Sequence, residues 1–202
     1  MADVEYWFPT PLWFSELNVD NKPVEKFCKK LAEKSKGRVL SNVGGWQSDD
    51  LYFHEKTDNK LKPLFNLIWL ELKNVADKLN LLEHYKLNEN TLQFWININN
   101  QENYNAIHNH PCSFLSGVYY VKVPKNSGNI IFHHPNPLMK FWYQQYTKTL
   151  SHESHPTVFV EPKENKLVIF PSWLEHVVEP NKSKKDRISI AFNIALTNND
   201  FI

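Results

Sequence analysis

Residues 166–196, KLVIFPSWLEHVVEPNKSKKDRISIAFNIAL, contain three short apolar runs separated by polar and turn-forming residues. The runs are rich in Val, Ile, Phe and Trp, which are the residues that β-strands favour. Four similar runs precede them in the chain: LQFWINI (92–98), FLSGVYYVKV (114–123), NIIFHH (129–134) and TVFVEP (157–162). Seven short strands joined by polar turns predict an antiparallel sandwich or barrel.

The first part of the chain carries a helical pattern instead. Residues 23–36 predict an amphipathic helix, with Pro23 at its first position and Gly37 at its end. Residues 59–80 place apolar side chains at steps of three and four. That spacing predicts a long helix with one buried face and with Pro63 in its first turn.

Two further segments complete the predicted organisation. Residues 6–19 predict a strand, and residues 41–53 predict a turn-rich loop. We expect a single domain over residues 1–202, mainly β with N-terminal helices. In this arrangement residues 1–90 form a supporting strand and helices, and residues 91–202 form the β-core.

The composition is that of an ordinary globular protein. Of the 202 residues, 42% are hydrophobic and 22% are charged, and the formal net charge is +1. A charge this small does not favour a nucleic-acid partner. No apolar run approaches the length of a membrane span, and no glycine-rich phosphate loop occurs. With two cysteines, Cys28 and Cys112, and no signal-peptide pattern, we expect a cytoplasmic protein.

Two histidines, His108 and His110, stand one residue apart in IHNHP. On an extended backbone their side chains project from one face. His176 follows an apolar strand, and a barrel would bring it opposite the first two. Three protein ligands on one face of an iron leave positions open for small molecules, as in non-haem Fe(II) oxygenases. The simpler interpretation is three unrelated histidines with local hydrogen bonds.

An arginine follows on the next predicted strand, because Arg187 lies eleven residues after His176. A buried arginine needs an anionic partner, and its planar fork suits a carboxylate. Asp186 is expected to face away from it, so a small dicarboxylate ligand would satisfy the guanidinium. The alternative is an exposed arginine at the start of a strand.

With these residues in order, the C-terminal half resembles the 2-oxoglutarate- and Fe(II)-dependent dioxygenase superfamily. The usual pattern there is H-x-D/E, a distal histidine, and an arginine or lysine about ten residues later. The whole chain is similar to a small family of oxygenases from marine bacteria and cyanophages. The matching stretches are FPTPLW, GGWQSDDL, WININNQENYNAIHNHP, LSGVYYVKVP, LVIFPSWLEHVVEP and RISIAFNI. The resemblance implies a double-stranded β-helix, which is a cupin-like jelly roll.

The resemblance also assigns roles to single residues. His108 matches the first iron ligand, and His176 matches the distal ligand. Arg187 matches the residue that grips the far carboxylate of 2-oxoglutarate. Tyr120 resembles a strand tyrosine that, in prolyl hydroxylases, binds the same carboxylate, and Asn99 stands where those enzymes often place another site residue.

One position departs from the superfamily, which has a carboxylate where this chain has His110. Either His110 is the third iron ligand, which the extended backbone favours, or it stands aside and a water or another group completes the site. A neutral imidazole in place of a carboxylate leaves the site more positive. Such a site would hold Fe(II) less tightly and an anionic ligand more tightly.

The resemblance therefore implies an enzyme, an Fe(II)- and 2-oxoglutarate-dependent hydroxylase that consumes O2. Its substrate would be an amino-acid side chain, free or in a protein, or a small metabolite. Two alternatives stay open: a three-histidine cupin-type dioxygenase without a co-substrate, and a non-catalytic jelly-roll binding or structural protein. We expect no membrane partner, a homodimer remains open, and a phage-encoded protein would act in the host cytoplasm.

Overall fold

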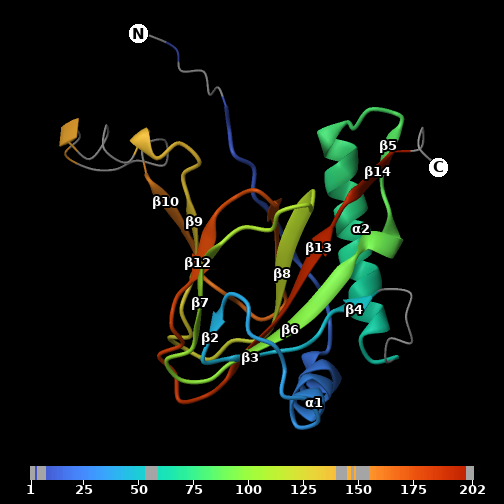
Figure 1. The fold of residues 1–202 in the computed structure, drawn as a ribbon, viewed down its shortest axis with the longest axis vertical. Coiled ribbons are helices and arrows are strands. Elements are labelled where there is room, and N and C mark those ends of the chain that lie inside the picture. The colour runs from blue at the N-terminus through green and yellow to red at the C-terminus, as the bar shows by residue number, and fades with distance from the viewer. Residues whose placement is uncertain are drawn as a thin grey trace.

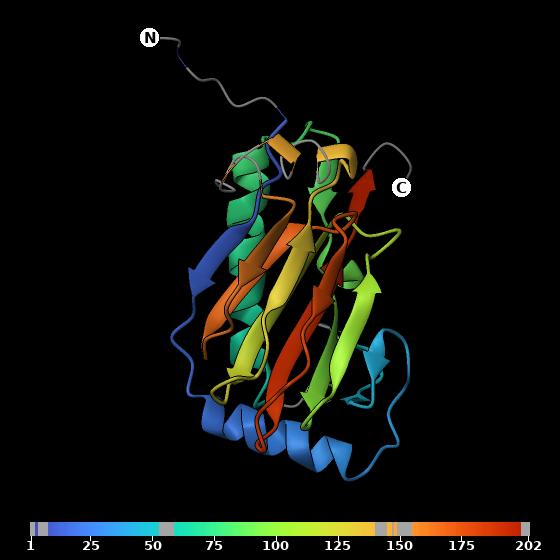
Figure 2. The same ribbon diagram turned by 90° about the vertical axis from the view of Figure 1, so that its left-hand side faces the viewer.

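The computed structural model describes residues 3, 8–52, 59–139, 145, 146, 148 and 155–198. These residues form two antiparallel sheets packed as a jelly roll, together with two helices, as predicted. Figure 1 shows the smaller sheet on the left, the larger sheet in the middle and α2 on the right. Figure 2 looks onto the smaller sheet, with α1 crossing beneath its strands.

The elements have the following bounds. The helices are α1 (Asn21–Ala32), α2 (Lys62–Leu79) and a 3-10 turn, η1 (Glu89–Thr91). The strands are β1 (Trp13–Glu16), β2 (Asn42–Val43), β3 (Trp46–Gln47), β4 (Leu51–Tyr52), β5 (Tyr85–Leu87), β6 (Gln93–Asn99), β7 (Tyr104–His108), β8 (Leu115–Lys122), β9 (Ile130–His133), β10 (Thr157–Val160), β11 (Lys166–Pro171), β12 (His176–Val178), β13 (Arg187–Ile194) and β14 (Leu196–Asn198).

Two sheets build the jelly roll. The larger has the order β1-β11-β8-β13-β6-β3, with β4 also paired to β6. The smaller has the order β10-β9-β12-β7-β2, and β14 pairs with β5 in a separate ribbon. Strands far apart in sequence are therefore neighbours, as jelly-roll connections require. The space between the two sheets is where the candidate site lies.

Alternation along the strands of the larger sheet separates two faces. On β13, Ile188, Ile190 and Phe192 join the core that packs under the helices. Arg187 and Ser189, on the opposite face, turn toward the smaller sheet. Because successive side chains of a strand point to opposite faces, one face of β13 packs into the apolar core and the other faces the polar space between the sheets.

The helices cover the apolar face of the larger sheet. On α2, Leu64, Phe65, Ile68, Leu72 and Val75 are buried at helical spacing. The ring of Phe65 stacks on Phe94 of β6, with the centroids 3.6 Å apart. Burial of this apolar face stabilises the packing of α2 on the larger sheet.

The two predicted helices have different outcomes. The long helix is confirmed, and Pro63 lies in its first turn. The bounds of the shorter one were wrong, because it begins at Asn21, so Pro23 is its third residue, and ends at Ala32. The side chain of Asp20 accepts a hydrogen bond from the Lys22 amide and caps the helix before Pro23.

The segment 41–53 is more ordered than the predicted loop, since it contains β2, β3 and β4. These strands have two residues each, too few for a pattern of alternation to show. They form because β7 and β6 offer backbone partners. The predicted strand over residues 6–19 reduces to β1 among the described residues.

The N-terminal strand β1 lies along β11 at one margin of the larger sheet. Trp13 pairs with Ile169, and Glu16 pairs with Lys166. β1 is short, it follows Pro11, and Glu16 forms an exposed ion pair with Lys163. These features suit an outermost strand.

Replacement of Gly117 by alanine is expected to destabilise the protein by about 1–3 kcal/mol, the usual cost of overpacking. A Cβ atom there would lie against the Phe192 ring and 2.6 Å from the Val168 carbonyl oxygen. Urea unfolding of the variant beside wild type measures the loss. An unchanged midpoint would contradict this account of the packing.

The two cysteines are free and should differ in reactivity. Burial raises the pKa of the Cys28 thiol to about 12, whereas Cys112 is exposed. Since the thiolate is the reactive form, we expect one thiol to react with Ellman's reagent in the native protein and two after denaturation. Two fast-reacting thiols in the native protein would show that α1 opens readily.

No helix within the described ranges is both long and apolar enough to cross a bilayer.

Candidate metal centre

Strand pairing brings together two histidines that are far apart in the sequence. His108 is the last residue of β7, His176 is the first residue of β12, and the two are direct partners in the antiparallel ladder. Their ring centroids are 4.3 Å apart. The smaller sheet therefore fixes two imidazoles side by side.

His110 reaches the same place by another route. It lies beyond the end of β7, not within a strand, which differs from the extended-strand argument for its position. Its backbone amide donates to the Ser172 carbonyl at 2.9 Å, which ties it to the turn that precedes β12. Its ring centroid lies 5.1 Å from those of both His108 and His176.

The three histidines form a group that could hold a metal ion. One ligand atom from each, in His108, His110 and His176, lies within 4.8 Å of the others. In His108 and His176 the Nδ1 atom lies 2.7 Å and 2.9 Å from the carbonyl oxygens of Ala106 and Leu174. An Nδ1–H that donates to a carbonyl leaves Nε2 as the ligand atom.

Burial keeps these imidazoles neutral. It lowers the pKa of His110 to about 4, with a smaller contribution from His108, and lowers the pKa of His176 to about 3. Burial also lowers the pKa of His108. Neutral imidazole is the form that binds a metal, so the lone pairs are ready at neutral pH.

A small inner cavity of about 50 Å³ lies against all three histidines and extends to Arg187. Its apolar walls include Val118, Ile130 and Phe170. Besides the histidines, its polar lining comes from both sheets and from the loop before β2: Ser41, Asn97, Asn105, Tyr120, Arg187 and Ser189. The cavity thus joins a group of possible metal ligands to a buried cation.

Arg187 is 1% exposed, and its charge has no carboxylate partner among the described residues. Its Nη1 donates to the Ser127 carbonyl at 2.5 Å and, at 3.4 Å, to the carbonyls of Gly128 and Glu179. Its Nη2 is buried without a partner. Asp186 faces outward, as expected, and accepts from Asn100 at 2.6 Å.

Tyr120 is 3% exposed and lines the same cavity as Arg187. Burial raises the pKa of its phenol to about 12 although the nearby Arg187 lowers it. The hydroxyl therefore keeps its proton at neutral pH and can donate a hydrogen bond to an anion. Tyr119 points to the opposite side, where its hydroxyl lies 2.6 Å from Asn165 Oδ1 and 2.8 Å from Asn21 Oδ1 and can donate its one proton to either.

Asn99 pairs with Arg187 across β6 and β13 but does not line the inner cavity. Its carbonyl accepts a hydrogen bond from the Asn181 side chain at 2.8 Å. Asn97, two residues earlier on the same face, does line the cavity, and its Oδ1 is buried without a partner. The sequence reasoning missed Asn97, although the alternation of polar and apolar residues along 93–99 marks that face.

A second, outer cavity of about 300 Å³ adjoins the first. The two share Ser41, Trp95, His108 and His110, so these histidines stand at the boundary between them. The outer cavity is lined further by residues of β3, β6 and β13, of the segment before β2, and of the turns after β3 and β7. The sequence reasoning did not identify this cavity.

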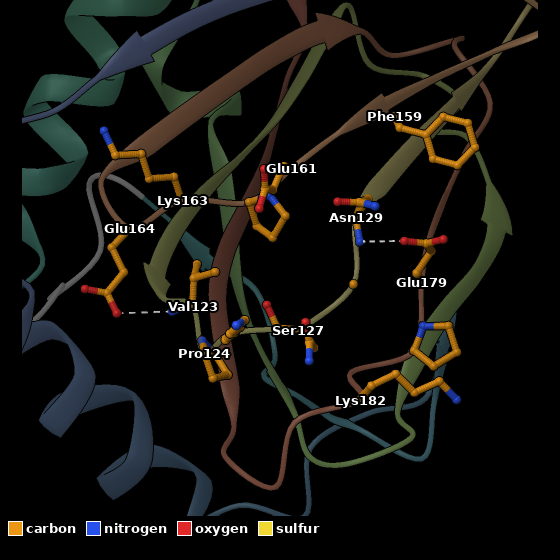
Figure 3. Close-up of a pocket in the computed structure, with 15 residues that line it drawn as sticks. Val123, Pro124, Ser127, Asn129, Phe159, Glu161, Lys163, Glu164, Glu179 and Lys182 are labelled. Atoms are coloured by element: carbon orange, nitrogen blue, oxygen red, sulfur yellow. Dashed lines mark hydrogen bonds between the residues drawn. The ribbon is translucent and has the colours of Figure 1, made fainter.

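A more spacious cavity, of about 920 Å³, lies elsewhere and is not the candidate centre. Figure 3 shows it as a hollow between turns, where the Asn129 amide donates to Glu179 and the Val123 amide to Glu164. None of the histidine group lines it. Its wall includes Ser127, whose carbonyl holds Arg187 from behind.

The residues present fit a divalent transition metal and a dicarboxylate. The donors are three neutral imidazoles, which suit iron and its neighbours in the first transition row. The buried Nη2 of Arg187 lacks an acceptor, and a carboxylate would supply one. The three histidines and Arg187 line the same cavity, and this links the metal site to the carboxylate site.

Comparison with known proteins agrees with this fit. A family profile described as "Putative 2OG-Fe(II) oxygenase" matches residues 93–193, a stretch that contains all three histidines and Arg187. Among curated proteins, none matches this chain in sequence.

Several solved structures are similar in fold. A prolyl-4-hydroxylase from Pseudomonas putida has a TM-score of 0.64 and 12% identity, over 92% of each chain. A prolyl hydroxylase from Trichoplax adhaerens, in complex with a hypoxia inducible factor peptide, has a TM-score of 0.63 and 13% identity, over 91% of this chain and 83% of that one. HygX from Streptomyces hygroscopicus, with nickel and 2-oxoglutarate bound, has a TM-score of 0.57 and 12% identity, over 92% and 83%. At these identities the likeness shows the jelly-roll fold.

Proposed function

The chain belongs to the family of 2OG-Fe(II) oxygenases, and from that premise we propose that it is an Fe(II)- and 2-oxoglutarate-dependent hydroxylase. The observation that carries the proposal is Arg187. A buried guanidinium with a free Nη2 lies in one cavity with three neutral histidines. Such a cation is expected where a dicarboxylate co-substrate must be held beside a metal.

In this proposal His108, His110 and His176 hold Fe(II), each through one ring nitrogen. The carbonyls of Ala106 and Leu174 orient two of the rings. Iron together with bound 2-oxoglutarate supplies the oxidant for a substrate C–H bond, with succinate and CO2 as co-products of O2 reduction.

The remaining residues of the inner cavity position the co-substrate. Arg187 holds the far carboxylate of 2-oxoglutarate through Nη2, while the carbonyls behind Nη1 keep the guanidinium in place. Tyr120 donates its phenolic proton to the same carboxylate. Asn99 contributes as the strand partner of Arg187, and apolar side chains such as Phe170 exclude water.

A cytoplasmic location is part of the same proposal, supported by two free cysteines. A homodimer stays a prediction.

The test is anaerobic reconstitution of the full chain with Fe(II) and 2-oxoglutarate. We expect a weak visible charge-transfer band that is absent when glutarate, which lacks the keto group, replaces 2-oxoglutarate. Admission of O2 should then yield succinate. If the protein binds iron but gives neither the charge-transfer band nor succinate, the proposal is wrong. That result would favour a dioxygenase that needs no co-substrate, or a non-catalytic binding protein.

A further inference from the structure

The outer cavity lies directly against two of the proposed metal ligands. It shares His108, His110, Trp95 and Ser41 with the inner cavity, but Arg187 and Tyr120 do not line it. A molecule in the outer cavity would therefore contact the histidines without competing for the dicarboxylate site. Its volume, about 300 Å³, suits a small molecule.

Two amide side chains in this cavity are held in fixed orientations. The Nε2 of Gln93 donates to the Tyr52 hydroxyl at 2.9 Å, and the Oδ1 of Asn193 accepts from the Ser116 hydroxyl at 2.7 Å. Both line the cavity. Within the described residues, the Gln93 carbonyl and the Asn193 amide hydrogens have no hydrogen-bond partner. One acceptor and one donor are thus presented to a ligand.

Two further polar side chains, Gln47 and Arg38, line the outer cavity. Gln47 is 2% exposed, and its side chain makes no hydrogen bond to any described residue. The Nε of Arg38 is buried and has no partner. Buried polar atoms normally have partners, so the unpartnered Nε of Arg38 points to a ligand in this cavity, beside the half-buried amides of Gln93 and Asn193.

The charges of the outer cavity cancel. Arg38 and Asp50 form a two-point ion pair, Nη1 to Oδ2 at 3.0 Å and Nη2 to Oδ1. They are the only Asp, Glu, Lys or Arg residues that line the cavity in the described part of the chain. A charged ligand would either have to break this pair or bury its charge without a partner, and both are unfavourable.

We propose that the outer cavity binds the primary substrate, and that this substrate is a small, electrically neutral molecule bearing a carboxamide. A carboxamide carries an acceptor and two donors in one plane, so it can pair with the Gln93 carbonyl and the Asn193 amide at once. Oxidation of this substrate rests on the proposed function, whereas its binding does not.

The experiment is a ligand-observed NMR screen of the full chain, without iron or 2-oxoglutarate. The fragments are matched in size and fall into four classes of equal number: neutral carboxamides, carboxylic acids, amines and zwitterionic amino acids. We expect carboxamides to dominate the hits. Equal or tighter binding of a charged class, or no binding in any class, would overturn the proposal.

Variants locate the binding. Gln93→Leu and Asn193→Leu should each weaken the best carboxamide at least tenfold, whereas Gln101→Leu, at an exposed turn outside both cavities, should not. Gln93→Glu keeps the shape and adds a negative charge, so it should shift the preference toward amines. Unchanged affinity and preference in all these variants would overturn the assignment.

The outcomes separate this proposal from the oxygenase proposal. If carboxamides bind but the iron experiment gives no charge-transfer band, the substrate site is supported and 2-oxoglutarate is ruled out as the co-substrate. The band without carboxamide binding would keep the oxygenase and remove this substrate class.

Discussion

Replacement of His176 by alanine is expected to weaken the binding of Co(II), an oxygen-stable substitute for Fe(II), by at least about 100-fold. Loss of an outer partner of a metal ligand already costs about 10–100-fold in affinity, so loss of a direct ligand should exceed that range. Among the described residues, this group of possible metal ligands contains only His108, His110 and His176. No further ligand is therefore at hand to take the place of His176. Titration of the cobalt absorption bands measures the affinity.

The matched control is His84→Ala. His84 lies after α2, where its ring packs against Tyr85 with centroids 4.5 Å apart, and it belongs to neither cavity. Its replacement should leave Co(II) affinity within about threefold of wild type. A His176→Ala protein that folds normally and binds Co(II) as tightly as this control would show that the histidines are not a metal centre.

The same titration decides the role of His110. If it coordinates, His110→Ala should lose affinity about as strongly as His176→Ala, and His110→Asp should retain binding because a carboxylate oxygen is also a ligand. Near-wild-type affinity in His110→Ala would leave a two-histidine site and contradict the proposed ligand set.

Replacement of Arg187 by methionine is expected to raise the Kd for 2-oxoglutarate by about 10- to 100-fold. Hydrogen bonds to charged groups contribute about 1.5–3 kcal/mol, and about 1.4 kcal/mol corresponds to a factor of ten. Co(II) affinity should stay close to wild type, because Arg187 is not in the histidine group. Calorimetric titration of 2-oxoglutarate into the Co(II)-loaded protein measures the Kd for 2-oxoglutarate, and titration of the cobalt absorption bands measures the metal affinity.

The only other arginine in the chain provides the control. Arg38 lines the outer cavity and pairs with Asp50, so Arg38→Met should leave the 2-oxoglutarate Kd nearly unchanged. Equal loss in the two arginine variants would mean a general electrostatic effect. Unchanged affinity in a folded Arg187→Met protein would remove Arg187 from the co-substrate site.

Local pattern predicted the fold where elements were long. Residues 62–79 repeat apolar side chains at helical spacing, and the seven strand runs each span several residues, so their types were predicted correctly. Elements of two residues, such as β2 and β3, have no internal pattern. They exist because a neighbouring strand offers hydrogen bonds, which only the folded chain brings near.

The candidate site shows the same division. The residue types and the spacing of His108 and His110, and of His176 and Arg187, suggested the chemistry. Their meeting depends on long-range contacts, such as the pairing of His108 with His176 and the bond from His110 to Ser172. The outer cavity draws its lining from separate strands and loops, so no single stretch of sequence could reveal it.

The position of β1 bears on aggregation. All but one residue of β11 are buried, and if β1 did not cover it, its unpaired backbone would be an apolar edge to which other chains could add. β1 covers this edge and does not itself continue it, because it has four residues, follows Pro11 and ends at the charged Glu16. A chain shortened beyond Glu16 would keep its histidines and its barrel strands, yet it would lose the segment that prevents one molecule from adding its sheet to the next.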